Sequence, residues 1–444
     1  MESVKRGGNI STALCVSALV FLLPAVCGAM VDPETAAELK LLREQNALLK
    51  GQVEKQNTVI ESLSEKVDGL TRAEEKRAEK DDNGASANAG ALTPLANDLH
   101  NVHISGEGAV AFFHSDKNGS FPNSEFRVDE AKLFVEAPIW QDVYFYSELN
   151  LALHENDTLN PELGELYLDF EDVSKLWGQE RQLNIRAGRI DIPFGEEYIY
   201  RDAIDNPFIS HSLSDIWGVD AGVELYGSFG KFSYTVAVQN GGLDPAHDFN
   251  ADKSVVARVS YDPTRWLHLS VSGMRTGDLD ANMDYLSAVW FGNGWFRSLG
   301  STNTTTFNAN MVEGDVIIKL PRGRIHAFGG YIVYDDNDPM ANNRRDAFYY
   351  SVEGVLNVTK KFYVGGRFSQ IISCKGLPIP ANGDYDNYFN SELTRDIWRL
   401  SLGTGYQFSR HLVVKAEYTL EEGRTVDGDN RCDNQFAAEA AFGF

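Results

Sequence analysis

The stretch Asn434–Phe444, NQFAAEAAFGF, indicates the fold. Apolar residues stand at every second position from Phe436 to Phe444, and the residues between them are small or, at Glu439, acidic. A period of two indicates a β-strand whose faces meet different environments. A strand that ends on Phe and carries Glu439 on its other face is unusual for a soluble core. It is typical of the closing strand of a membrane β-barrel, with lipid on one face and a polar lumen on the other.

The composition agrees with an exported protein. The chain has 444 residues, a formal net charge of -24 and a mean hydropathy of -0.30. Lys5 and Arg6 precede the apolar run Ser11–Val26, so residues 1–29 are predicted to be a secretory signal peptide, with a lipoprotein site at Cys27 as the alternative. No later run is long and apolar enough for a transmembrane helix. The acidic balance argues against a nucleic-acid partner.

Two segments precede the strands. From Leu39 to Leu70, apolar residues are spaced alternately three and four apart, which predicts a coiled coil over residues 30–72. Asn46 falls within this seam, where one buried amide specifies register and oligomeric state. A lone amphipathic helix is the alternative. Residues 73–101 turn to Glu, Lys, Ala, Asn and Gly and are predicted to be a linker.

From residue 102 to residue 444 the period changes to two. About sixteen segments have one apolar and one polar face, among them Val143–Leu153, Lys231–Gln239, Trp266–Gly273 and His411–Leu420. Short connections alternate with long ones, as in outer-membrane barrels, whereas a soluble β-sandwich would not sort its loops this way. We therefore predict an all-β, antiparallel transmembrane barrel of about sixteen strands. An even strand count places both termini, and with them the coiled coil, in the periplasm.

The third long loop is unusually rich in apolar residues. Residues 189–220 read RIDIPFGEEYIYRDAIDNPFISHSLSDIWGVD. A loop of this length is usually functional when it is ordered. In a wide barrel it can fold inward, bury its apolar residues against the wall and leave its charges facing water.

This loop carries a family resemblance. The motifs GRIDIPFG, YRDAIDNPFISHSL and WGVDAGVELYG, together with the strand FRVDEAKLFVEAP and the final FGF, resemble the phosphate-selective porin family of Gram-negative outer membranes. The resemblance implies a sixteen-stranded homotrimeric porin whose third loop constricts the pore. It implies the lipid bilayer, lipopolysaccharide and small hydrophilic solutes or ions as partners, and no cofactor. Phosphate-specific members line the pore with many Arg and Lys, and this chain departs from that pattern.

Alternation assigns the candidate pore residues. The predicted constriction consists of Arg186, Arg189, Asp191, Glu196, Glu197, Arg201, Asp202, Asp205 and Asp215. The predicted lining consists of Lys132, Glu148, Arg258, Lys319, Arg367, Arg399, Lys415 and Glu417. With the other inward carboxylates counted, acids outnumber bases, so we expect weak selectivity that favours cations, because a charged ring selects by sign. A hydrated wall of paired charges without any preference is the alternative.

Three further expectations remain. Cys374 and Cys432 are predicted to form a disulfide across the last two outer loops. The function that fits best is passive diffusion of small hydrophilic solutes or ions, without enzymatic activity. The alternatives are a structural barrel that tethers the envelope through the coiled coil and, less favoured, a barrel lipase using Ser210 and His211.

Overall fold

The structure is a computed structural model of the chain. It describes residues 102–117, 121–154, 161–241, 248, 251–280, 305–339, 344–375, 394–425 and 430–444. These residues belong to one compact unit, Pro94–Phe444. The predicted signal peptide, coiled coil and linker lie outside the described residues. In the described part of the chain, no helix is long and apolar enough to span a membrane.

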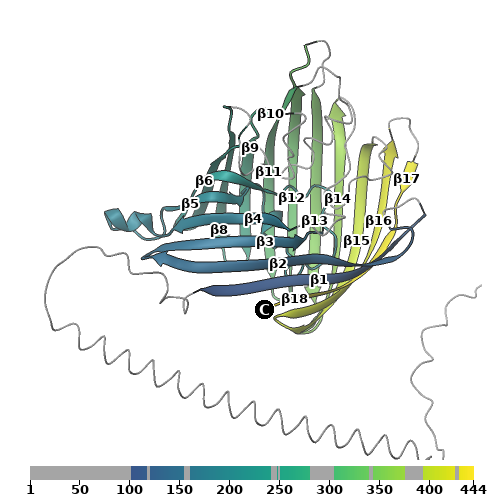
Figure 1. Ribbon diagram of the computed structural model, residues 1–444. Coiled ribbons are helices and arrows are strands. Elements are labelled where there is room, and N and C mark those ends of the chain that lie inside the picture. The colour runs from purple at the N-terminus through teal and green to yellow at the C-terminus, as the bar shows by residue number, and fades with distance from the viewer. Residues whose placement is uncertain are drawn as a thin grey trace, which may run out of the picture. The chain divides into compact units, whose positions relative to one another are not determined.

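The described residues form a single antiparallel sheet (Figure 1). Its strands are β1 His103–Ser115, β2 Glu125–Trp140, β3 Val143–Ala152, β4 Glu162–Phe170, β5 Asn184–Asp191, β6 Val219–Phe229, β7 Phe232–Gln239, β8 Ser254–Thr264, β9 Leu267–Arg275, β10 Leu279–Asp280, β11 Thr306–Leu320, β12 Gly323–Asp336, β13 Arg345–Asn357, β14 Phe362–Lys375, β15 Thr394–Ser409, β16 Leu412–Thr425, β17 Asn430–Cys432 and β18 Gln435–Gly443. Two short 3-10 helices, η3 Val173–Trp177 and η4 Glu197–Tyr200, lie in connections.

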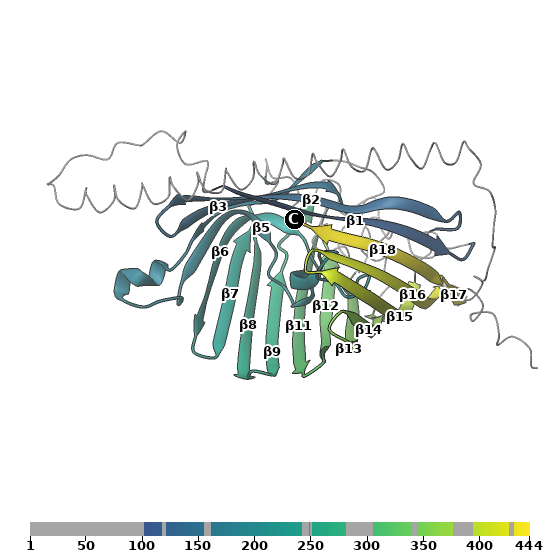
Figure 2. The ribbon, with the colours of Figure 1, turned by 90° about the horizontal axis from the view of Figure 1, so that it is seen from below.

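The sheet closes on itself. β10 and β17 are short additions beside β11 and β16, and the sixteen long strands form the barrel. β18 closes it between β16 and β1 (Figure 2). In the strand register, Glu439 lies opposite Lys415 on one side and Ala111 on the other. The prediction of an antiparallel barrel of about sixteen strands is confirmed. The four segments named from the sequence correspond to β3, β7, β9 and β16.

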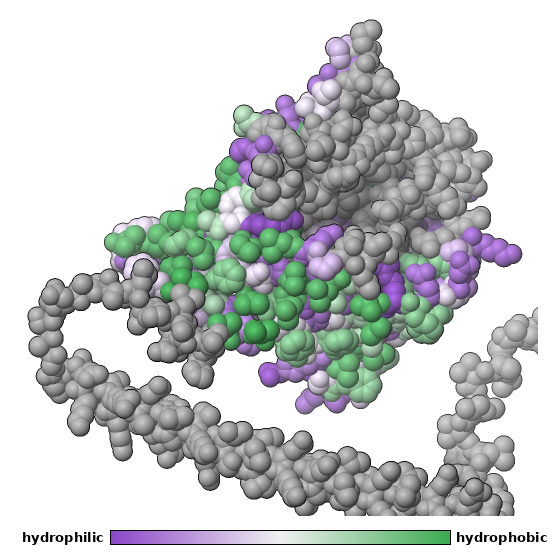
Figure 3. All heavy atoms as spheres, in the orientation of Figure 1, coloured by the Kyte–Doolittle hydropathy of each residue, from purple (hydrophilic) through white to green (hydrophobic). Residues whose placement is uncertain are grey.

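The two faces of the wall differ as the alternation predicts. Large apolar side chains point outward at every second position, for example Leu166 and Leu168 on β4 and Val255 and Val259 on β8, and all four are exposed. Figure 3 shows such residues gathered over the wall that faces the viewer. Exposed apolar area of this extent is far beyond what a soluble monomer presents to water. Charged and hydroxyl side chains fill the alternate, inward positions.

The predicted disulfide is wrong. Cys374 on β14 and Cys432 on β17 are both free and exposed. Cys432 lies opposite Glu422 of β16, Glu422 lies opposite Trp398 of β15, and Trp398 lies opposite Gln370 of β14. Three strand spacings, about 14 Å, therefore separate the two cysteines across the sheet. A disulfide needs Cα atoms within about 7 Å. The alternation of short and long connections in the sequence could not show that β15 and β16 lie between the two cysteines.

Candidate functional site: the lumen and its inner loop

Residues 192–218, here called the inner loop, connect β5 to β6 and lie against the inner wall of the barrel. The apolar residues Ile192, Phe194, Leu213 and Ile216 are buried. They pack in one cluster with inward residues of β7, β8, β9 and β11 to β15, such as Ala237, Val256, Met274, Met311 and Ile371. Burying these side chains stabilises the inward path of the loop, because apolar surface leaves the water of the lumen.

The start of the inner loop is held on β8 and β9. Arg258 donates to the carbonyl of Gly195 at 2.7 Å, and the amide of Gly195 donates to the hydroxyl of Ser272 at 3.0 Å. Glu196 accepts from His268 at 3.1 Å and lies 3.8 Å from Arg258. Arg258 and Glu196 were both predicted to face the pore. They face each other and the loop backbone instead.

The middle of the inner loop is held by basic side chains of β14, β15 and β16. The ammonium of Lys415 donates to the carbonyls of Ala203 at 2.6 Å, Phe208 at 2.9 Å and Asn206 at 3.3 Å. Arg367 donates to the carbonyl of Ser210 at 2.6 Å. In the same way, Arg399 donates to the carbonyl of His211 at 3.0 Å. These three predicted lining residues are buried, so their donors serve the loop rather than the passage.

Glu417 is the acidic counterpart of these bases. Its carboxylate accepts from the amides of Ile209 at 2.6 Å and Ser210 at 2.8 Å, and from the hydroxyl of Ser210 at 2.6 Å. The hydroxyl of Ser210 also lies within hydrogen-bond distance of Ser401 and accepts from Arg367. The ring of His211 lies at the carbonyl of Arg201, 3.2 Å away. Ser210 therefore holds the loop in place through the contacts of its hydroxyl with Glu417, Ser401 and Arg367.

Phe208 anchors the loop against the wall. Its ring is buried, and the guanidinium of Arg367 lies over it at 4.7 Å. A Cβ atom on Gly365 would lie 2.9 Å from this ring, and one on Gly403 would lie 2.7 Å from it. Both distances are too short for real contacts, so the two glycines form a slot, here called the glycine slot, that only a bare backbone leaves open.

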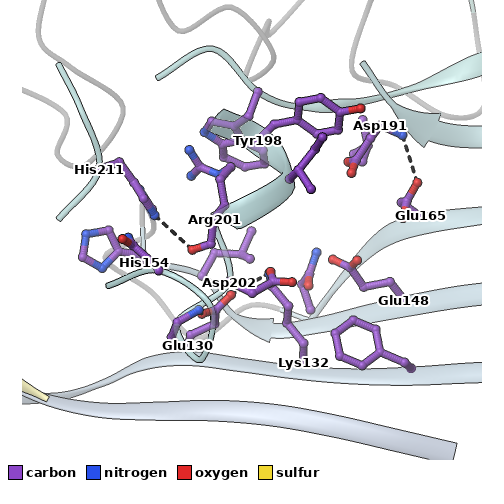
Figure 4. Close-up of a pocket in the computed structure, with 18 of the residues that line it drawn as sticks. Glu130, Lys132, Glu148, His154, Glu165, Asp191, Tyr198, Arg201, Asp202 and His211 are labelled. Carbon is purple, nitrogen blue, oxygen red and sulfur yellow. Dashed lines mark hydrogen bonds and ion pairs between the residues drawn. The ribbon is translucent and has the colours of Figure 1, made fainter. Parts of the chain in front are cut away.

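Between the loop and β2, β3 and β4 lies a cavity of about 450 Å³, here called the acidic cavity (Figure 4). The ionisable groups that line it are the acids Asp129, Glu130, Glu136, Glu148, Glu165, Asp191, Asp202 and Glu439, the bases Lys132 and Arg201, and His154 and His211. Phe134, Tyr146, Tyr198, Ile199 and Trp217 supply apolar and aromatic surface.

Both bases of the acidic cavity are engaged. Lys132 forms ion pairs with Glu130 at 2.6 Å, with Asp202 and, at 3.6 Å, with Glu107. Arg201 pairs with Asp215 and lies over the ring of Trp217 at 4.2 Å. In the described part of the chain, the carboxylates of Glu107, Glu130 and Asp202 are the one group close enough to hold a metal ion. The ammonium of Lys132 lies among them, so this group binds a cation of the protein itself.

The lysine also affects the ionisation of the loop. Burial alone would raise the pKa of Asp202, but the charge of Lys132 and the hydrogen bond from it hold this pKa below its usual value. Asp205, further along the loop, has a raised pKa because of burial and of repulsion from Asp202. Asp205 and Arg324 line a second pocket, near the turn between β11 and β12.

The remaining predicted residues are spread over the lumen. Arg186 on β5 pairs with Asp169 at 2.8 Å and Glu224 at 3.3 Å. Glu197 accepts from the amide and the hydroxyl of Ser212 within the loop.

Two further predicted basic residues lie on β5 and β11. Arg189 lies opposite Leu166 and Ala221, donates to the carbonyls of Leu163 and Gly164, and interacts through its charge with Asp220, Glu148 and Asp191. Lys319 lies exposed at the end of β11.

The sequence interpretation missed four contributors. Phe208, Gly365 and Gly403 form the anchor, and Tyr198 carries an aromatic ring from the loop into the acidic cavity. Phe208 is an apolar residue amid charged ones, and Gly365 and Gly403 interrupt strand patterns. Such glycines often mark a close approach of another group. These two signals could have identified Phe208 and the two glycines as unusual, but not that Phe208 packs against the glycines.

Comparisons with known proteins identify the architecture. No family model matches the chain, and no curated protein matches its sequence. Among solved structures, it is similar to the outer membrane channel DcaP of Acinetobacter baumannii, with 12% identity over 77% of this chain and 97% of that chain and a TM-score of 0.53. It is similar to OmpT, an outer membrane protein of Vibrio cholerae, in a trimer form, with 13% identity over 77% and 99% and a TM-score of 0.52. An anion-selective porin from Comamonas acidovorans has 9% identity over 77% and 99% and a TM-score of 0.50. At these identities the likeness is one of fold: the chain has the barrel of outer-membrane channels.

Proposed function

We propose that the protein is an outer-membrane channel through which small hydrophilic solutes or ions diffuse passively, with the inner loop as its constriction. One observation carries this proposal. A closed barrel has an apolar outer face and a charged interior, and an ordered loop inside it leaves a cavity lined by polar groups. Closed barrels are one of two structures that can span a bilayer, because no backbone group is left without a partner.

The charges of the cavity support a preference for cations. Its carboxylates far outnumber Lys132 and Arg201, and both of these bases are held in ion pairs. Arg258, Arg367, Arg399 and Lys415 bind the loop backbone. Groups that could attract a phosphate are thus occupied, and we do not propose phosphate selectivity. The preference is expected to be moderate, because salt screens exposed charges.

The assembly belongs to the same proposal. Residues 1–29 act as a signal peptide and residues 102–444 sit in the outer membrane as a homotrimer. Residues 30–72 form a periplasmic coiled coil, joined to the barrel by residues 73–101. The heptad pattern supports the coiled coil, and the trimer form of the similar barrel from Vibrio cholerae supports the homotrimer.

The test is single-channel recording with residues 30–444 refolded and inserted into planar bilayers. Discrete, long-lived conductance steps that scale with protein concentration are expected. A folded barrel, identified by its heat-dependent migration in a denaturing gel, that inserts without conducting would contradict the proposal. That result would favour the envelope-tethering alternative.

A further inference from the structure

We propose that the acidic cavity recognises organic cations, namely solutes that carry an ammonium or guanidinium group on a carbon skeleton, as they pass. This inference rests on the proposed channel function and names the class of solute. The recognising groups are the carboxylates of Glu148 on β3, Glu165 on β4 and Asp191 at the end of β5.

These three carboxylates share one side of the acidic cavity. Figure 4 shows Glu148, Glu165 and Asp191 on the same side, with Tyr198 facing them from the loop. The amide of Asp191 donates to Glu165 at 3.0 Å, which keeps the two residues together. Within the described ranges, no ion pair joins any of the three to a Lys, Arg or His, and Lys132, Arg186 and Arg189 act on them only through longer-range charge interactions. Partly buried carboxylates such as these lose part of their hydration, and the cationic group of a solute can supply the interactions that water no longer provides.

The basic groups nearby are committed elsewhere. Arg186 is held by Asp169 and Glu224, and Lys132 is held by Glu130 and Asp202. Arg189 donates to the carbonyls of Leu163 and Gly164. Neither Arg186 nor Lys132 can pair closely with the three carboxylates without leaving the partners it already has, so these pairs are expected to persist.

The lumen already contains one ammonium group that is bound by carboxylates. The ammonium of Lys132 lies among three carboxylates, 2.6 Å from Glu130 and 3.6 Å from Glu107, with Asp202 as its third partner. Glu148 and Asp191 line the same cavity as this lysine but receive no such group. Their carboxylate oxygens do not converge with Glu165 as metal ligands would, since that close grouping occurs at Glu107, Glu130 and Asp202 among the described residues. An extended organic cation fits separated carboxylates better than a metal ion does.

Aromatic rings supply a surface for the body of the solute. Tyr146 stacks on Tyr167 with ring centroids 5.0 Å apart and lies 6.3 Å from Phe134. Cations favour the faces of such rings. The chain's own Arg186 lies over Tyr167 at 5.1 Å, so a guanidinium has already been accommodated beside this wall. A cavity of about 450 Å³ lies within the range of small-molecule sites.

The experiment compares arginine with citrulline in planar bilayers. The two amino acids share their size and their α-amino and carboxyl groups, and differ in that arginine carries a guanidinium where citrulline carries a neutral ureido group. Added arginine should reduce the potassium current through the channel in a concentration-dependent way, whereas citrulline should not. In the double variant Glu148→Gln and Glu165→Gln, the half-blocking concentration of arginine should rise about tenfold, as expected for one lost charge-assisted hydrogen bond.

The matched control is the double variant Glu171→Gln and Glu180→Gln. Both side chains are exposed in the connection between β4 and β5, outside the acidic cavity, so the same net charge is removed without touching the wall. Arginine should block this variant as it blocks the original protein. Equal effects of arginine and citrulline on a conducting channel would overturn the inference and leave the proposed function intact. Equal block of the original protein and both double variants would overturn it as well. A folded barrel without any conductance would overturn the proposed function itself.

Discussion

The charged side chains of the lumen bind backbone more than they face water. Lys415 gives hydrogen bonds to three loop carbonyls, and Glu417 accepts hydrogen bonds from two loop amides. Hydrogen bonds to charged groups contribute about 1.5–3 kcal/mol each, more than neutral ones. A loop without regular secondary structure can therefore keep one path across the lumen, because the wall satisfies the backbone groups that a helix or strand would pair.

Replacing Lys415 by Met tests this account. The substitution keeps a similar length but leaves three carbonyls and Glu439, which lies 2.6 Å from the ammonium, without their donor. Each buried group left unsatisfied costs about 1–3 kcal/mol, so the loop should loosen. We expect larger current fluctuations and faster proteolysis within residues 192–218. Lys360→Met, at an exposed turn, is the control, and identical behaviour of the two variants would contradict the account.

The two cysteines lead to a separate prediction. Because about three strand spacings separate Cys374 from Cys432, both thiols should be free. Alkylation of the unreduced, unfolded protein without its signal peptide should label both cysteines, as mass spectrometry can count. A product with neither cysteine labelled, which becomes labelled after reduction, would show that they are bridged.

At the scale of elements, the inner loop is a fixed part of the wall rather than a lid. It is anchored to β8 and β9 at its start, to β14, β15 and β16 in its middle, and to β2 through the amide of Ala203, which donates to Glu130 at 2.8 Å. These strands lie on different sides of the barrel, since the sheet runs once around the lumen. The loop therefore spans the lumen, and in the proposed channel solutes would have to pass beside it.

The glycine slot is where this anchoring can be broken by one methyl group. Gly365→Ala or Gly403→Ala would place a Cβ within 3.0 Å of the ring of Phe208 and push it off the wall. Phe208→Ala should have the same effect by removing the ring, a change that costs about 3–5 kcal/mol in a packed core. All three variants should increase the single-channel conductance.

The matched control for the slot is Gly354→Ala. This glycine lies on the neighbouring β13, and a Cβ there would meet nothing within 4 Å. Its conductance should equal that of the original protein. If the two slot variants also keep the original conductance while remaining folded, Phe208 does not hold the constriction.

The alternation in the sequence predicted which way most side chains point, but not what they touch. Lys415 and Arg367 do point inward, yet their partners are carbonyls of residues far away in the sequence. A carbonyl is present in every residue, so the sequence gives no sign of which ones will be bound. The sequence also placed the start of the loop too early: β5 continues to Asp191, so Arg189 lies within a strand, opposite Leu166 and Ala221.

At the scale of the whole molecule, the barrel reconciles a mean hydropathy of -0.30 and a net charge of -24 with an apolar exterior. The charges line the lumen, and alternate residues such as Val271 and Val312 form the outer belt. The closing strand Gln435–Gly443 shows both faces within one segment, with Glu439 buried inside and Phe436 and Phe442 exposed outside. Because successive side chains point to opposite faces of a strand, the period of two separates the charged lumen from the apolar exterior.

The most direct test of the central claim, an open passage lined by carboxylates beside a fixed loop, is the reversal potential in a KCl gradient. We predict a reversal potential with the sign of potassium selectivity, because the acidic cavity presents an excess of carboxylates to the solution. Raising the salt concentration on both sides should reduce it through screening. In the double variant Glu148→Gln and Glu165→Gln it should move toward zero. A reversal potential with the sign of chloride selectivity, or one that the double variant leaves unchanged, would contradict the account.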